Sequence, residues 1–181
     1  MGTDGPKRSR AREPLHAKTG WKMPCGRARI SLPADERAGM GDGAPTELLF
    51  LADDEGNSVT VSVLGRKPRW TAGLEAEIVV RTPFVSGRTD LALHLSKLEE
   101  WADALDRLDA GEDVAWMEMS RGPSLFIQLD GERGCPEVVV EDESLSMVTV
   151  RVPLVPPDDW ISDHRRRLRD VMDHWVPMLS G

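Results

Sequence analysis

The four histidines could support metal chemistry, because neutral imidazole is a common metal ligand. His164 and His174 lie ten positions apart in one segment with helical spacing, whereas His16 and His94 lie far from them in the sequence. A protein metal site needs three or four converging ligands, and no third ligand is indicated beside the pair. The pattern therefore favours His164 as a partly buried core residue, and it predicts no metal site and no cofactor.

Covalent catalysis would need a serine or cysteine on a sharp turn with a base beside it. Ser124 and Cys135 lie near predicted turns, in RGPSLF and RGCPEV, but neither segment contains a nucleophile elbow or a matched histidine. The 31 acidic residues make any pairing of two carboxylates uninformative about glycoside hydrolysis. We predict no catalytic residue, so a non-enzymatic protein is favoured while an enzyme stays open.

The segment GRKPRW, residues 65–70, is the one most typical of a binding site. Cations beside an aromatic ring can hold a phosphate or an acidic partner. The alternative is a solvated loop whose tryptophan covers a sheet edge, and that interpretation is favoured. The candidate interaction surface consists of Arg66, Lys67, Arg69 and Trp70.

Length and composition fit one soluble globular domain, with 181 residues of which 40% are hydrophobic and 30% charged. No apolar run approaches the ~20 residues that span a bilayer. The basic N-terminus has no apolar segment behind it, so it does not resemble a secretory signal. These features predict a cytoplasmic protein with no membrane partner.

The net charge of −8 is divided unevenly along the chain. Residues 1–43 carry nine Lys and Arg against five Asp and Glu, whereas residues 44–181 carry fourteen against twenty-six. An acidic folded part is repelled by nucleic-acid phosphates and by anionic membranes. Nucleic acid is therefore a disfavoured partner, and another protein is the expected one.

Residues 1–44 have no apolar periodicity and are rich in Gly, Pro and Arg. Such a segment cannot bury enough apolar surface to offset its chain entropy, so we predict a disordered basic tail. One interpretation is an arm that binds nucleic acid. The favoured one is that translation starts at Met23 or Met40, so that residues 1–39 do not belong to the native protein.

Alternation of apolar and polar residues predicts strands, because successive side chains of a strand point to opposite faces. Val59, Val61 and Val63 alternate with Ser and Thr, and the turn ADDEGN separates them from the apolar run at 48–51. This turn has the first oxygen spacing of a calcium loop but lacks the later ligands, so a hairpin is favoured. Further strands are predicted around 74–81, 88–94, 114–119, 125–129, 138–140 and 145–152.

The acidic segment LSKLEEWADALDRLDAGEDVAW, residues 95–116, predicts a helix followed by a strand. Apolar residues recur at positions 98, 101, 105 and 108, which places Trp101 on the buried face and the carboxylates on solvated faces. Trp116 alternates inward in the following strand. Both tryptophans are therefore predicted to be core residues rather than parts of a binding site.

Local signals predict where this helix begins and ends. Ser96 and Glu99 have the spacing of a capping box, in which each side chain satisfies a free backbone N–H of the first turn. Gly111 supplies a residue that adopts the left-handed conformation after the last turn.

The C-terminal helix is predicted from an apolar stripe that includes Ile161, His164 and Trp175. Asp158 or Asp159 is placed to cap it, and Pro177 is expected to end it. Its basic run HRRRLR lies among aspartates, so salt bridges along the helix are expected to occupy these cations.

The order of these elements predicts an α+β fold. We expect an antiparallel sheet of about eight strands in meander order, with one mid-chain helix and one C-terminal helix, in a single domain of residues 45–177. The sequence contains neither GxGxxG nor GxxxxGK[ST], so a nucleotide-binding motif is not indicated.

The segments LEEWADALDRLDAGEDVAW and LDGERGCPEV are the most specific parts of a resemblance that covers about residues 47–176. Here the chain resembles a family of small uncharacterised proteins of unknown function from high-GC Gram-positive bacteria. That resemblance implies no activity and no catalytic residue. More loosely, the layout is similar to that of WapI-type immunity proteins, which bind and neutralise a toxin.

Two hypotheses follow for function. The first is a non-enzymatic protein-binding domain, immunity-like in character, because an acidic protein suits a basic toxin. The second is a small-molecule-binding protein or an enzyme, with a pocket between sheet and helices. Binding of nucleic acid through the tail is a third, less favoured, reading.

Overall fold

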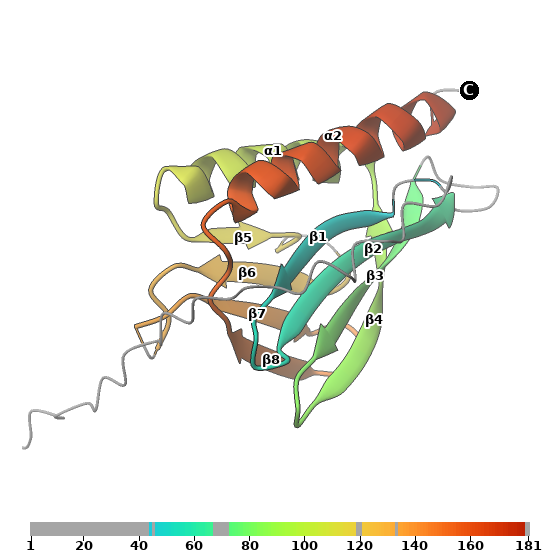
Figure 1. The fold of residues 1–181 in the computed structure, drawn as a ribbon. Helices are drawn as coiled ribbons and strands as arrows, with labels where there is room; N and C mark the ends of the chain where they lie inside the picture. The colour runs from blue at the N-terminus through green and yellow to red at the C-terminus, as the bar shows by residue number, and fades with distance from the viewer. Residues whose placement is uncertain (1–43, 45, 67–72, 119–120, 133, 180–181) are drawn as a thin grey trace, which may run out of the picture.

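The computed structural model describes residue 44 and residues 46–66, 73–118, 121–132 and 134–179. Apart from residue 44, the predicted tail lies outside these residues. Its disorder, and the start of translation at Met23 or Met40, therefore stay predictions. The described part contains eight antiparallel strands and two helices, which confirms the predicted α+β class (Figure 1). No helix in it is long and apolar enough to cross a membrane.

The strands form two four-stranded sheets, each a meander in chain order. Helix α1 (Leu95–Asp109) follows the first sheet and helix α2 (Trp160–Leu179) follows the second. The first sheet comprises β1 (Glu47–Ala52), β2 (Ser58–Arg66), β3 (Leu74–Arg81) and β4 (Ser86–Leu93). The second sheet comprises β5 (Val114–Trp116), β6 (Ser124–Gln128), β7 (Glu137–Asp142) and β8 (Val148–Pro153).

The predicted hairpin between the first two strands is confirmed. Asp53 holds its turn: its carboxylate accepts hydrogen bonds from the backbone N–H groups of Glu55 and Asn57, each at 2.9 Å, and from the Asn57 side chain at 2.8 Å. Both carboxylate oxygens of Asp53, the first ligand that a calcium loop would use, are thus engaged by the turn itself. The alternation of Val59, Val61 and Val63 places all three fully inside the core, as expected for a half-buried strand.

Helix α1 begins two residues earlier than the capping-box prediction requires. Its first residue is Leu95 and its N-cap is His94, whose side chain makes no capping hydrogen bond. The N–H of Lys97 donates to the His94 backbone carbonyl at 2.9 Å instead. The predicted capping box of Ser96 and Glu99 is therefore wrong, because the His94 carbonyl already accepts the first hydrogen bonds of the helix, so Ser96 is a helical residue and not the N-cap.

The C-terminal ends of the two helices differ in how well local signals predict them. Gly111 has a φ of 83°, as the predicted left-handed stop requires, and its N–H donates to the Leu108 carbonyl at 3.0 Å. Pro177, by contrast, lies inside α2, which continues to Leu179, so the predicted end at this proline is wrong. A proline removes one backbone hydrogen bond, and this loss matters least in the last turn.

The inner faces of both sheets and the buried faces of both helices form one continuous core. The helices lie side by side across one end of the sheets, with α2 against β1 and α1 against β5 (Figure 1). Trp101 of α1 and Trp116 of β5 are 0% and 1% exposed, and their ring centroids lie 5.2 Å apart. Their prediction as core residues on different elements is confirmed.

The two indoles offer a matched test of this core. The Trp116 Nε1–H donates to the Lys97 carbonyl at 2.9 Å, whereas the Trp101 Nε1–H has no hydrogen-bond partner among the described residues. Trp116→Phe and Trp101→Phe remove similar buried volumes, so the loss of stability from the cavity is about the same in both variants. We expect Trp116→Phe to lower the free energy of unfolding by about 1 kcal/mol more, because it alone loses a hydrogen bond. Urea denaturation measures both, and a larger loss for Trp101→Phe would contradict the assignment.

Candidate functional site

His164 lies where α2 crosses the edge of the first sheet, and it is 1% exposed. The backbone N–H of Phe50 in β1 donates to its Nε2 at 3.0 Å. Nε2 must therefore be unprotonated, so the ring proton is on Nδ1, which donates to the Trp160 carbonyl at 2.6 Å. The neutral imidazole thus satisfies a backbone donor that the edge of β1 would otherwise leave free.

The surroundings of His164 oppose its protonation. Burial, which disfavours the charged ring, lowers its pKa most, and the nearby Arg167 cation lowers the pKa further, although the Trp160 carbonyl and Asp163 act the other way. Arg167 also lies over the Phe50 ring, 5.7 Å from its centroid. The prediction of His164 as a core residue is therefore confirmed, and both ring nitrogens have protein partners.

The other candidate ligands do not converge on His164. His174 packs edge-on against Trp175 further along α2, with ring centroids 4.9 Å apart, and His94 is exposed at the start of α1. Within the described ranges, no three His, Cys, Asp or Glu side chains are grouped so as to hold a metal ion. The candidate nucleophile Ser124 begins β6, and its hydroxyl lies 3.5 Å from the Met117 carbonyl.

The prediction that salt bridges along the helix occupy the basic run of α2 is confirmed for Arg166 and Arg167, whereas Arg169 has no ion pair among the described residues. Arg166 pairs with Asp163 and Asp170 along the helix, and Arg167 pairs with Asp163 at 2.6 Å. The sequence did not indicate that the run also joins different elements. Arg167 reaches Glu47 of β1 at 2.5 Å.

Arg165 makes the second contact between elements, and it lies across the two helices. It pairs with Asp106 and Asp109 of α1 at 2.7 and 3.0 Å. Helix spacing identifies partners within one helix but not those on another element.

The candidate surface around GRKPRW is only partly described. Arg66 ends β2 with an exposed side chain. Lys67, Arg69 and Trp70 lie outside the described residues, so their role as an interaction surface stays a prediction.

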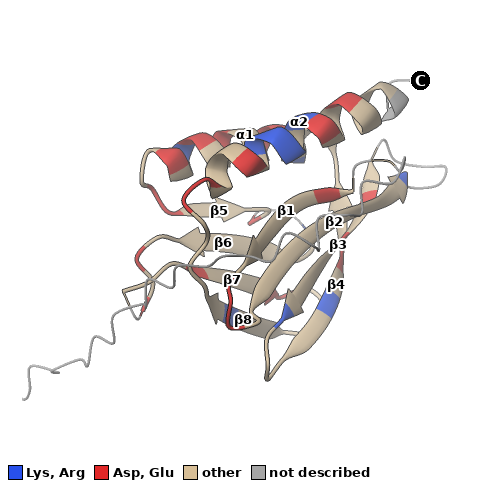
Figure 2. Ribbon diagram, in the orientation of Figure 1, with Lys and Arg blue, Asp and Glu red and all other residues tan. Residues whose placement is uncertain are grey.

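The outward side of α1 and the loop after it carry a concentration of acidic side chains. Figure 2 shows acidic residues along α1, whereas along α2 a group of basic residues lies between acidic ones. All of these carboxylates are exposed, and we call them the acidic surface: Glu99, Glu100, Asp103, Asp106, Asp109, Glu112 and Asp113.

Three cations lie against the acidic surface, and each already has a partner there. Lys97 pairs with Glu100 at 2.7 Å and Arg107 pairs with Glu112 at 3.0 Å. Arg165 of α2 pairs with Asp106 of the acidic surface. In the described structure, Glu99 and Asp103 have no ion pair. They lie four residues apart, so both carboxylates are on one side of the helix. Uncompensated negative charge therefore remains at this point of the surface.

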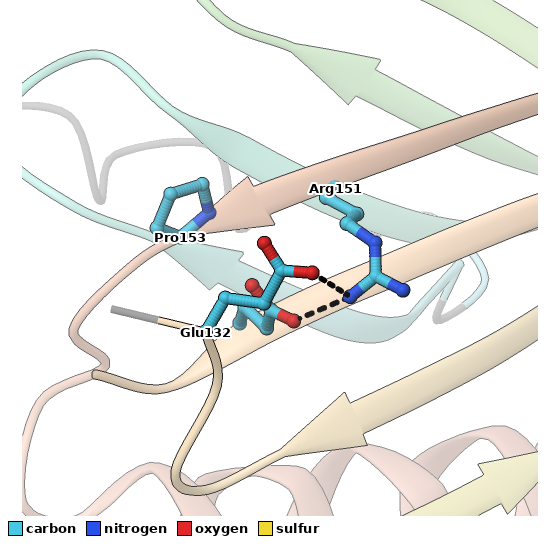
Figure 3. Close-up of a pocket in the computed structure, with 4 residues that line it drawn as sticks. Glu132, Arg151 and Pro153 are labelled. Carbon is cyan, nitrogen blue, oxygen red and sulfur yellow. Dashed lines mark hydrogen bonds and ion pairs between the residues drawn. The ribbon is translucent and has the colours of Figure 1, made fainter. Parts of the chain in front are cut away.

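Two hollows open on the described surface. One, of about 280 Å³, lies between α1 and α2, and its lining includes Leu105 and Leu168 as well as the paired Asp106 and Arg165. Another, of about 170 Å³, lies beside β8 and is lined by Glu132, Glu137, Arg151 and Pro153 (Figure 3).

An ion pair within the chain lines the hollow beside β8. Arg151 is 2.8 Å from Glu137 and 3.9 Å from Glu132 (Figure 3). Glu137 is 5% exposed and packs so closely on Gly131 that a Cβ there would lie 2.6 Å from its Cγ. The polar groups of this hollow therefore bind one another, and the arrangement is typical of a structural contact rather than of a reaction centre.

With this geometry established, comparison with known proteins gives one finding. A model described as "Family of unknown function (DUF5959)" matches residues 46–176. The chain belongs to this family. Neither the curated proteins nor the solved structures give a match to the DUF5959 chain. The resemblance to an uncharacterised family is thus confirmed, and the matched residues include both sheets, α1 and most of α2.

The pH dependence of stability tests the role of His164 in this DUF5959 protein. Because the pKa of His164 in the folded chain lies below the ordinary histidine value of 6.5, the unfolded chain binds the proton more readily. Neutral His164 therefore contributes fully to the free energy of unfolding above about pH 6.5. This contribution is lost as the pH falls below that value, with a slope of at most about 1.4 kcal/mol per pH unit.

The variant His164→Gln keeps an acceptor for the Phe50 N–H but does not titrate. Histidine normally changes charge between about pH 5 and 8. We therefore expect the difference in free energy of unfolding between wild type and variant, measured by urea titration, to shrink as the pH is lowered from about 7 to about 5. A difference that is independent of pH would show that His164 is not held neutral.

Proposed function

We propose that this chain is a non-enzymatic protein-binding domain whose acidic surface on α1 receives a basic partner, in the manner of an immunity protein. The observation that carries the proposal is the uncompensated charge at Glu99 and Asp103. Lys97, Arg107 and Arg165 are already paired with other members of the same surface. Additional cations from a partner would therefore be attracted to it.

Electrostatic steering supports this assignment. Residues 44–181 carry fourteen basic and twenty-six acidic side chains, so the field around this part of the chain attracts a basic protein from a distance. Complementary charge raises the association rate and suppresses wrong partners more than it raises affinity. A basic toxin domain, such as a nuclease that must itself bind phosphates, has the matching charge.

The alternative of a small molecule or an enzyme reaction needs a pocket between sheets and helices. That space is filled by fully buried side chains, including Trp101, Trp116, Leu98 and Leu105. The hollows described above lie on the outer surface instead. The packing therefore favours recognition by an external surface.

Affinity purification from the native host, with paired variants, tests the proposal. The variant Glu99→Gln/Asp103→Asn removes two charges of the acidic surface that have no ion pair in the described structure. The control Glu75→Gln/Glu143→Gln neutralises two exposed carboxylates elsewhere, on β3 and in the β7–β8 turn. We expect wild type and control to retain the same basic protein, and the α1 variant to associate with it about tenfold more slowly at low salt.

Association rates measured on the purified pair at low and high salt decide the outcome. A rate that is unchanged in the α1 variant, or a partner that is acidic, would contradict the proposal. A binding site elsewhere on the domain would appear as a loss in the control instead.

A further inference from the structure

The two sheets have four edge strands, and these are not protected alike. The edges are β1 and β4 in the first sheet, and β5 and β8 in the second. Helix α2 covers β1, where His164 accepts the Phe50 N–H, and helix α1 lies against β5. An edge strand that is left open presents free backbone donors and acceptors to another chain.

On β4 the register shows which backbone groups face outward. The Thr82 N–H donates to the Val85 carbonyl at 2.7 Å, so this pair is a hydrogen-bonded one. Hydrogen-bonded pairs alternate along an antiparallel ladder, and β3 and β4 pair without a register shift. The odd-numbered residues of β4 therefore bond to β3. The outward-facing groups belong to Ser86, Arg88, Asp90 and Ala92.

Two of these outward residues carry opposite, exposed charges. Arg88 and Asp90 are exposed, and in the part of the chain that the structure describes neither has an ion pair. Asp90 also lies directly opposite Glu77 of β3, and like charges at directly opposed positions destabilise a sheet. A cation supplied from beyond the edge would relieve this repulsion.

We propose that β4 pairs antiparallel with β4 of a second copy of the chain, about a two-fold axis through Thr89. Arg88 then lies opposite Asp90 of the second copy, and Asp90 lies opposite Arg88 of that copy. Both positions have outward-facing backbone groups, so each charged pair coincides with a hydrogen-bonded pair of the new ladder. The same patch serves both copies, as a two-fold interface requires.

Charge selects this register over its neighbours. Outward-facing groups recur at every second residue, so the nearest alternative two-fold arrangements place Arg88 opposite Arg88 or Asp90 opposite Asp90. Both bring like charges together. The arrangement about Thr89 is thus the one in which the edge is complementary to itself.

Apolar side chains at both ends of the edge fit the same arrangement. Phe84, in the β3–β4 turn, is 95% exposed, and Leu95, at the start of α1, is 38% exposed. Antiparallel pairing about Thr89 places the β3–β4 turn of one copy beside the β4–α1 junction of the other. These two side chains are brought together twice, once at each end of the interface.

The remaining edge, β8, lacks this complementarity. Its charged residue, Arg151, is already paired with Glu137 and Glu132 of its own chain. Pro153 has no N–H to donate and blunts the end of the strand. A second copy therefore fits β4 better than β8.

Charge exchange tests the proposal on the full chain. Arg88→Asp leaves two acidic residues on the edge and Asp90→Arg leaves two basic ones, so each variant repels its own copy. We expect the wild type to sediment as a dimer of 20.1 kDa chains, and each single variant to dimerise at least about tenfold more weakly. The double exchange Arg88→Asp/Asp90→Arg restores both pairs and should restore the dimer.

Mixing the two single variants gives a sharper readout, because their edges are complementary to each other. We expect an equimolar mixture to form a dimer in sedimentation velocity although neither component does so alone. Arg121→Asp reverses an exposed arginine in the β5–β6 turn and should leave the wild-type dimer intact, and circular dichroism checks that every variant is folded. A wild type that is monomeric overturns the proposal. So does a mixture that stays monomeric together with a double exchange that dimerises no better than the single variants.

Discussion

The fold depends on the burial of three aromatic rings from three different elements. Trp101 of α1, Trp116 of β5 and His164 of α2 meet at one point, with the ring centroids of Trp101 and His164 6.3 Å apart. Burying rings of this size is among the largest favourable contributions that single side chains make. Their contact fixes both helices against both sheets, since His164 also holds β1 and Trp116 also holds the first turn of α1.

This junction also determines which backbone groups reach the surface. A sheet edge needs a partner for its free donors and acceptors, and the helices supply cover at one end of the molecule. His164 accounts for the Phe50 N–H there. The other edge strands of the two sheets, β4 and β8, are not covered by these helices. Strand β4 carries exposed side chains of opposite charge, whereas β8 carries an arginine that is paired within its own chain and a proline.

The distribution of charge follows from the same packing. Arginines of α2 lie close to β1 and α1, so Arg165 and Arg167 are engaged in joining elements and add little free positive charge to the surface. The acids of α1 outnumber the cations that reach them. A domain built in this way presents a negative surface, and the proposed recognition of a basic protein rests on this feature.

Much of this could be read from the sequence, because periodicity reflects burial directly. The period-two pattern of Val59, Val61 and Val63 and the helical spacing of Trp101 placed these residues on the inner face of a strand and of α1, and a turn of polar residues was sufficient to identify the β1–β2 hairpin. The strand number, the meander order and both helices follow from such local patterns. The aspartates near the basic run of α2 likewise indicated its pairs along the helix.

The tertiary structure alone decided how segments far apart in the chain lie relative to one another. The division into two sheets, the start of α1 at Leu95 and the pairing of Arg167 with Glu47 all depend on which surfaces meet after folding. Local sequence contains no record of such distances, and a signal as plausible as the Ser96–Glu99 spacing does not mark the start of a helix that already begins at Leu95, with only His94 between it and β4. The hydrogen bond from Phe50 to His164 spans 114 positions, and no pattern of residues along the chain could have shown it.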